Sequence, residues 1–169
     1  LIGEAHQRGR AVAIHCVTRA ELVFAVSAFD QAGARIGDRI EHASIAPPDQ
    51  LERLARMPLT VVTQPGFLCE RGDSYARDVE PSDRPWLYRG LGFLHSGVPL
   101  GGGTDAPYGS ADPWRAIAAA VSRRTPDGRV MEHSECLTPE QALALFTTSS
   151  EAPGGEPRRV AIGRAADLC

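Results

Sequence analysis

The sequence predicts an α/β chain in which parallel strands alternate with helices. Four short apolar runs each end in a polar residue, at His15, His42, Gln64 and Asp105. Successive members of this set lie roughly one strand-plus-helix unit apart, and such a unit takes about 30 residues. The chain has 169 residues, whereas a complete eight-stranded α/β barrel needs at least about 200. About four strand-helix units are therefore expected.

The N-terminal part is expected to form a helix, a strand and a second helix. The first helix covers 2–8 and ends at Gly9, and the strand covers 11–16. Thr18 is a suitable N-cap for a helix over 19–32, because its hydroxyl can accept a hydrogen bond from a free N–H of the first turn. Apolar residues recur at helical spacing along this second helix.

The middle of the chain predicts two strands, one helix and a long loop. The strands are expected over 38–43 and 59–64, and two prolines open a helix over 48–57, since proline suits a first helical turn. Residues 65–84 are rich in Arg, Asp and Glu and predict a loop. Loops of this length are usually functional lids or disordered segments.

The C-terminal part predicts a fourth strand between helices. A helix begins at Pro85 and covers 85–96, the strand covers 98–103, and further helices cover 113–123 and 139–148. The TPEQ sequence that begins the last helix resembles a capping box. Regular alternation of strands and helices implies parallel strands joined by right-handed crossovers.

Alternation along each strand predicts which side chains face the interior of a barrel. Neighbouring side chains of a strand point to opposite faces, so Cys16 is expected to face a covering helix, and Arg39 and Glu41 to point away from the interior. The residues assigned to the inward face are Ala11, Ala13, His15, Ile40, His42 and Val62, with Leu100 or its glycine neighbours Gly101 and Gly103 before Asp105.

Composition excludes several classes of partner. Hydrophobic residues make up 43% of the chain and the formal net charge is −3. No basic stripe with interleaved aromatic residues indicates nucleic-acid binding, and no apolar run approaches the roughly 20 residues of a membrane span. The first residues resemble a helix more than a signal peptide, so a cytoplasmic location is expected. The four cysteines are widely spaced without a CxxC pair, which favours reduced thiols.

Both ends of the chain predict truncation. Leu1 is not a start methionine, and the last residues, RVAIGRAADLC, stop within a segment that predicts a strand. His6, His95 and His133 follow no ligand pattern, and surface positions are expected for them.

The polar residues at the strand ends predict a metal site. Active sites of parallel α/β sheets and barrels lie at the carboxyl ends of the strands. Imidazole is the commonest metal ligand, and carboxylate completes many hydrolytic sites. Singly, a strand-end histidine is more often structural, and an aspartate before Ala-Pro is more often a turn residue. Together, His15, His42 and Asp105 favour a divalent-metal site, with Gln64, Phe67 and Tyr108 lining the substrate side.

Five stretches of the chain carry a resemblance to a known family. They are VAIHCVTRAEL, DRIEHASIAPPDQLERLARM, TVVTQPGF, FLHSGVPLGGGTDAP with DPWRAIAAAV, and LTPEQALALFTTSSEAP. The chain resembles the C-terminal half of a metal-dependent amidohydrolase of the N-substituted formamide deformylase and exoenzyme-like subgroup. The resemblance covers nearly the whole sequence. The ordered series of His, EHA, QP and GTDAP is its specific part.

The resemblance implies the C-terminal half of a TIM-type barrel over 1–150, contributing strands five to eight. Residues 151–169 would begin the return to a small β-sandwich. By the family pattern, His15 and His42 bind one metal, and Asp105 binds the other or the only metal and activates a water. Zinc is the expected ion, with one or two ions in a full-length protein. The family's His-x-His pair and its bridging Lys or Glu are absent here, and Val17-Thr18-Arg19 replace the Gly-Asp that often follows the first histidine.

The expected function is hydrolysis of C–N bonds in small amide-like or formamide-like substrates through a metal-bound hydroxide, with Asp105 as general base and then acid. The alternative is a catalytically inactive barrel fragment with a structural, self-associating role. Four strands cut from a barrel would leave unpaired edges, which recruit other strands. A homo-oligomer is therefore expected.

Overall fold

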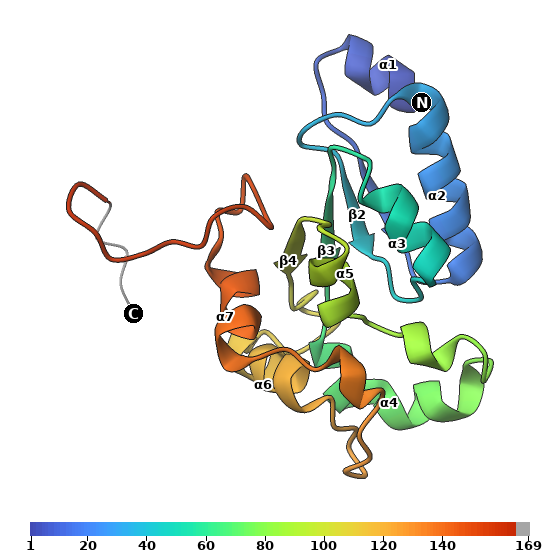
Figure 1. Ribbon diagram of the computed structural model, residues 1–169, viewed down its shortest axis with the longest axis vertical. Coiled ribbons are helices and arrows are strands. Elements are labelled where there is room, and N and C mark those ends of the chain that lie inside the picture. The colour runs from blue at the N-terminus through green and yellow to red at the C-terminus, as the bar shows by residue number, and fades with distance from the viewer. Residues whose placement is uncertain (165–169) are drawn as a thin grey trace.

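A computed structural model describes residues 1–164 and forms one parallel sheet covered by helices (Figure 1). The strands follow one another across the sheet in chain order, β1-β2-β3-β4, and every neighbouring pair is parallel. The strand bounds are β1 Ala13–Cys16, β2 Arg39–His42, β3 Thr60–Thr63 and β4 Leu100–Gly102. This confirms the predicted fold class, and the arrangement corresponds to part of an α/β barrel.

Helices precede, connect and follow the four strands. The α-helices are α1 Ile2–Gln7, α2 Arg19–Ala32, α3 Pro48–Leu54, α4 Gly66–Asp78, α5 Leu91–His95, α6 Pro113–Ser122 and α7 Pro139–Thr147. Two short 3₁₀ helices are η1 Arg84–Trp86 and η2 His133–Glu135. Within the described residues no helix is long and apolar enough to cross a membrane.

Side-chain caps explain why α2 and α7 begin where they do. The Thr18 hydroxyl accepts a hydrogen bond from the Glu21 N–H, and the Glu21 carboxylate accepts one from the Thr18 N–H in return. Thr138 and Gln141 form the same reciprocal pair at α7. Such caps satisfy N–H groups that have no partner within the helix. Both predicted helix starts are confirmed.

The prediction of a loop over 65–84 was wrong, because most of this segment is helix α4. Although the segment is rich in polar residues, one face of the helix is buried, and this face is formed by Phe67, Leu68 and Gly72. A side chain at Gly72 would begin 2.6 Å from Thr125 Cγ2, so only glycine allows this close approach. Tertiary packing therefore decides the helix, which its charged residues do not indicate.

The predicted single helix over 85–96 was also wrong, since η1 and α5 are separate helices. Between them the backbone of Tyr88 has a positive φ of 41° and its N–H donates to the Ser44 carbonyl at 2.8 Å. Leu87 and Tyr88 are both buried. The chain leaves the helical path here to bury two large side chains beneath the loop that follows β2.

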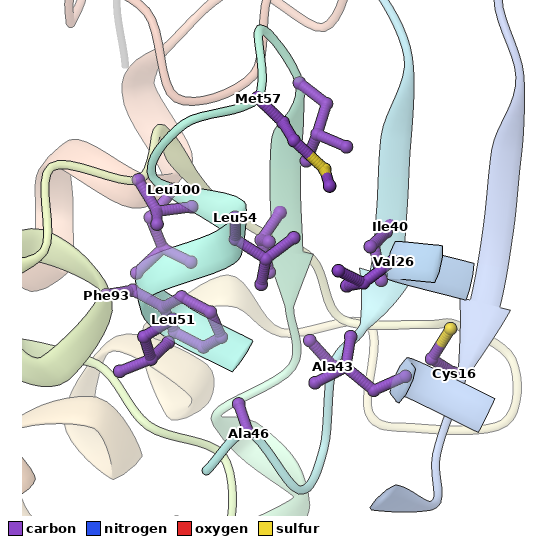
Figure 2. Close-up of a cluster of buried hydrophobic side chains, with 14 of the residues drawn as sticks. Cys16, Val26, Ile40, Ala43, Ala46, Leu51, Leu54, Met57, Phe93 and Leu100 are labelled. Atoms are coloured by element: carbon purple, nitrogen blue, oxygen red, sulfur yellow. The ribbon is translucent and has the colours of Figure 1, made fainter. Parts of the chain in front are cut away.

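The main core lies between the sheet and its helices, as Figure 2 shows. Ile40, Val61 and Leu100 form one row across β2, β3 and β4, and all three are buried. Figure 2 shows Ile40 and Leu100 among core side chains that include Val26 of α2 and Leu51 of α3. The inward assignment of Ile40 was therefore wrong, and at β4 the inward position belongs to Gly101 and not to Leu100. Cys16 packs in the helix-side core as expected.

The opposite face of the sheet carries the neighbouring row of residues. His15, Glu41, Val62 and Gly101 are successive partners across the four strands. The first three side chains are exposed or half-buried. A Cβ at Gly101 would lie 2.8 Å from Pro153 Cβ, so the segment after α7 packs against this end of the row. Glu41 thus lies on the open face, contrary to its predicted direction.

Residues 151–164 form turns and no strand in the described part of the chain, with one isolated bridge between Ser149 and Ala152. Residues 165–169 of the predicted return to a β-sandwich, including Cys169, lie outside the described residues.

His6 is buried, contrary to the surface position predicted for it, and its Nε2 lies 2.9 Å from the Asp38 carboxylate. That carboxylate also accepts hydrogen bonds from the Val12 and Arg35 N–H groups, so it orders the amino ends of β1 and β2.

Candidate active site

His15 and His42 meet at the carboxyl ends of β1 and β2. Their ring centroids are 4.6 Å apart and the rings are inclined at 71°. His15 is exposed on the open face. The register pairs His42 with Cys16, which packs in the helix-side core. Regular alternation would therefore direct the His42 ring into the helix-side core.

A turn of the backbone redirects His42. Its φ is 69° and that of Ala43 is 46°, both in the left-handed region that non-glycine residues seldom adopt. Such residues cost on the order of 1–3 kcal/mol each and persist only where surrounding contacts impose them. The predicted proximity of the two histidines is present, but the reason is this turn and not a shared strand face.

The environment of His42 favours the neutral imidazole. The side chain is buried, and its Nδ1 has no hydrogen-bond partner. Burial is the main cause that holds the pKa of His42 below its usual value, and the positive charge of His15 adds to this. The negative charges of Asp105 and Glu41 act in the opposite direction. A neutral ring nitrogen without a partner is the form in which histidine binds metal.

Asp105 lies in the exposed loop after β4, and its negative charge acts to raise the pKa of His42. Its φ is 54°, another left-handed non-glycine residue. The carbonyl of Asp105 accepts a hydrogen bond from the Gly109 N–H at 3.0 Å, which closes the turn that carries Tyr108. Asp105 thus belongs to the same edge as the histidine pair.

The ligand set fits a divalent metal in part. Two adjacent imidazoles and a nearby carboxylate are the donors that zinc and related ions use. Across residues 1–164, no three His, Cys, Asp or Glu side chains lie close enough together to hold one ion. The described chain therefore brings two histidines together, and the charge of Asp105 acts on one of them, His42.

Glu41 is a residue that the sequence reasoning placed elsewhere. It is the register partner of His15 and forms an ion pair with Arg39 at 2.7 Å on the open face. The pairing of β1 with β2 would have shown that Glu41 and His15 share a face. An error of one residue in the assigned direction places every side chain of a strand on the opposite face of the sheet.

Gln64 follows β3 and is buried close to the site. Its Nε2 donates to the Val62 carbonyl at 3.2 Å, and its Oε1 has no partner. A Cβ at Gly103 would lie 3.4 Å from Gln64 Nε2, so the small residue of the last run leaves room for the amide. The Gln64 side chain also acts on His42 as a hydrogen-bonding group that raises the pKa of the imidazole, so its amide lies next to the histidine.

Phe67 connects the histidine pair to the predicted substrate side. Its ring is nearly parallel to His42, with centroids 6.2 Å apart. Tyr88 and Tyr108 meet it edge-on at 5.8 Å and 5.7 Å. The structure thus joins Phe67 and Tyr108, and it adds Tyr88, which the sequence reasoning did not select. Tyr108 remains 67% exposed.

Comparison with known proteins decides the family. Residues 1–169 match the model of the Amidohydrolase family over their full length. The chain belongs to this amidohydrolase family. A crystal structure of an uncharacterized metal-dependent hydrolase from Pyrococcus furiosus is similar to it, with a TM-score of 0.71 and 35% identity over 86% of this chain and 30% of the other.

Two curated relatives also match most of this chain. The N-substituted formamide deformylase of Arthrobacter pascens is 27% identical in an alignment of 172 positions that covers 97% of this chain. YtcJ of Bacillus subtilis (strain 168) is 29% identical in an alignment of 167 positions that covers 89% of this chain. The amidohydrolase chain spans 32% and 29% of the lengths of these relatives.

Proposed function

We propose that this amidohydrolase chain supplies part of the active site of a metal-dependent hydrolase that cleaves C–N bonds of amide-like or formamide-like substrates. The observation that carries the proposal is the edge-to-face pair of His15 and His42, 4.6 Å apart. Membership of the Amidohydrolase family and the likeness to a metal-dependent hydrolase support it.

His15 and His42 would hold a divalent metal, with zinc as the proposed ion. When bound, such an ion polarises a substrate carbonyl and acidifies a water. Asp105 accepts the proton of the attacking water and later donates it to the leaving nitrogen, as the C–N bond breaks. Gln64 offers its unpartnered amide oxygen to an N–H of the substrate. Phe67 and Tyr108 form the wall beside the carbonyl.

The ligand pair can be tested on the chain itself. Long-range ¹H–¹⁵N spectra resolve the imidazole rings, and Zn²⁺ is added stepwise. We expect the His15 and His42 rings to shift together at lower Zn²⁺ concentration than the ring of His133, which is exposed on η2. His133→Ala is the control variant and leaves the response unchanged, whereas His42→Ala removes it from His15. Simultaneous shifts of all the rings would refute a specific pair.

The reaction itself is tested on a full-length protein that contains this segment. The probe is N-benzylformamide, and the readout is release of formate and benzylamine in equal amounts. Turnover that requires added Zn²⁺ and is lost in His42→Ala supports the proposal. Metal-independent turnover, or none with any formamide or amide, contradicts it and favours a structural role.

A further inference from the structure

Arg71 is held in an unusual position at the rim of the candidate site. It lies one helical turn after Phe67 on α4, and its guanidinium carbon is 3.7 Å from the Tyr108 ring centroid and 4.7 Å from that of Phe67. Its Nη2 also donates to the Tyr108 backbone carbonyl at 2.8 Å. Two aromatic rings and one carbonyl therefore fix the plane of this guanidinium.

The charge of Arg71 is not neutralised by the described chain. Within residues 1–164, no carboxylate lies within ion-pair distance of it, whereas five other arginines form such pairs. The neighbouring Glu70 accepts a hydrogen bond from the Ser110 N–H instead. Arginine has five N–H donors, and a single one of them is used here. Most of the N–H donors of this guanidinium, which are arranged as a planar fork, therefore remain available to a ligand.

The position of Arg71 relates this fork to the reacting centre. Phe67 contacts Arg71 on one side, and on the other its ring stacks on His42 with an interplanar angle of 17°. Tyr108, under the guanidinium, is three residues after Asp105. Arg71 thus stands one aromatic ring away from the histidine pair. A small substrate with its carbonyl at the histidines would pass beside Phe67 before it reached Arg71.

We propose that Arg71 is a specificity-determining residue that binds a carboxylate of the substrate. This rests on the proposed function and narrows it to amides that carry an acid group a few bonds from the carbonyl. The planar fork matches a carboxylate through two parallel hydrogen bonds. Because the stack on Tyr108 already orders the side chain, little conformational entropy is lost on binding.

A matched pair of ligands tests the proposal. Hippurate carries an amide and a carboxylate, and hippuramide has the same skeleton without the charge. Both are titrated by NMR into the chain in the presence of EDTA, so the measurement does not depend on metal or turnover. We expect hippurate to bind more tightly than hippuramide by about 10- to 100-fold, the range of charge-assisted hydrogen bonds.

Three variants separate recognition from general charge. Arg71→Met should remove the preference for hippurate, and Arg71→Lys should restore only part of it, since lysine keeps the charge but lacks the planar fork. Arg77→Met is the matched control, because Arg77 is exposed on the same helix and contacts Ser74. It should leave the preference unchanged. Circular dichroism establishes that each variant is folded.

The outcomes distinguish this inference from the proposed function. Equal binding of the two ligands to the unmodified chain, or a preference that survives in Arg71→Met, overturns the role of Arg71. Loss of the preference in Arg77→Met as well assigns the effect to net charge and also overturns it. The proposed function fails separately, through the absence of a paired Zn²⁺ response at His15 and His42.

Discussion

Replacement of Arg123 by methionine should strongly destabilise the chain. Arg123 follows α6, is 1% exposed, and donates three hydrogen bonds to backbone carbonyls. The acceptors are Met131 at 2.6 Å, Tyr88 at 2.7 Å and Leu87 at 2.8 Å. Burial lowers the pKa of Arg123, and the charge of Glu135 opposes this. The guanidinium therefore joins two segments that have no strand pairing with each other.

The expected loss follows from these contacts. Each hydrogen bond to a charged group contributes about 1.5–3 kcal/mol, and the substitution leaves three carbonyls without a donor. Removal of the charge also relieves the cost of its burial, so the net loss is smaller than the sum. We expect the free energy of unfolding to fall by about 3–5 kcal/mol, which is below the sum of the three hydrogen bonds for that reason.

Urea unfolding followed by circular dichroism measures this loss. Arg124→Met is the matched control, because the exposed Arg124 makes one hydrogen bond, to the Gly128 carbonyl. A surface change of this kind should alter stability by no more than about 0.5 kcal/mol. If Arg123→Met falls within about 1 kcal/mol of the control, the reasoning about buried carbonyls is refuted.

Four further predictions concern the site, a thiol and assembly. In a full-length protein, Asp105→Asn should abolish hydrolysis without unfolding the protein, because an amide cannot accept the proton of water; near-native turnover would exclude this role. The isolated chain should lose Zn²⁺ on dialysis, since zinc sites normally need three or more protein ligands; stoichiometric zinc by atomic absorption would contradict this. Burial raises the pKa of Cys16 to about 12, so only a small fraction is thiolate at pH 8. Iodoacetamide should therefore alkylate the half-buried Cys136 before Cys16, with Cys16 reacting as the pH rises toward 12 or on unfolding; peptide mapping reads this order. Analytical ultracentrifugation at micromolar concentration should show a homo-oligomer, since β1 and β4 are the outer strands of the sheet in the described residues and an apolar hollow lies beside Val12 and Ile14; a clean monomer would contradict it.

Helix α2 shows what sequence can predict. Its first turn is marked by the Thr18–Glu21 capping box, and it ends at Gly33, whose φ of 78° suits glycine. Both signals are local, so the observed bounds match the predicted ones. Helix α4 has neither signal, because Pro65 makes no side-chain cap. Its buried face exists only once α6 and the loop at Thr125 are in place, and no local pattern reports that contact.

The candidate site shows the same division. The strand ends could be located from apolar runs, and this was sufficient to bring His15 and His42 to one edge. The direction of the His42 ring could not be predicted, because neither His42 nor Ala43 is a residue type that usually adopts the left-handed conformation. The contact of Arg71 with Phe67 could not be predicted for a different reason, because it depends on helical spacing in a segment that its composition assigned to a loop.

The distribution of backbone strain supports a functional reading of the edge where His42 lies. Six described non-glycine residues have a positive φ, and three of them, His42, Ala43 and Asp105, belong to the site or directly adjoin it. At His42 the alternative is regular strand geometry, which would place the ring beside Cys16 in an apolar core. The left-handed turn instead brings the ring against His15, with the ring centroids 4.6 Å apart. The same turn leaves Ala43 and Ser44 buried beneath the site, where the Ser44 carbonyl accepts the Tyr88 N–H. The conformation that aims the histidine is thus fixed by the contact that places the aromatic residues beneath it.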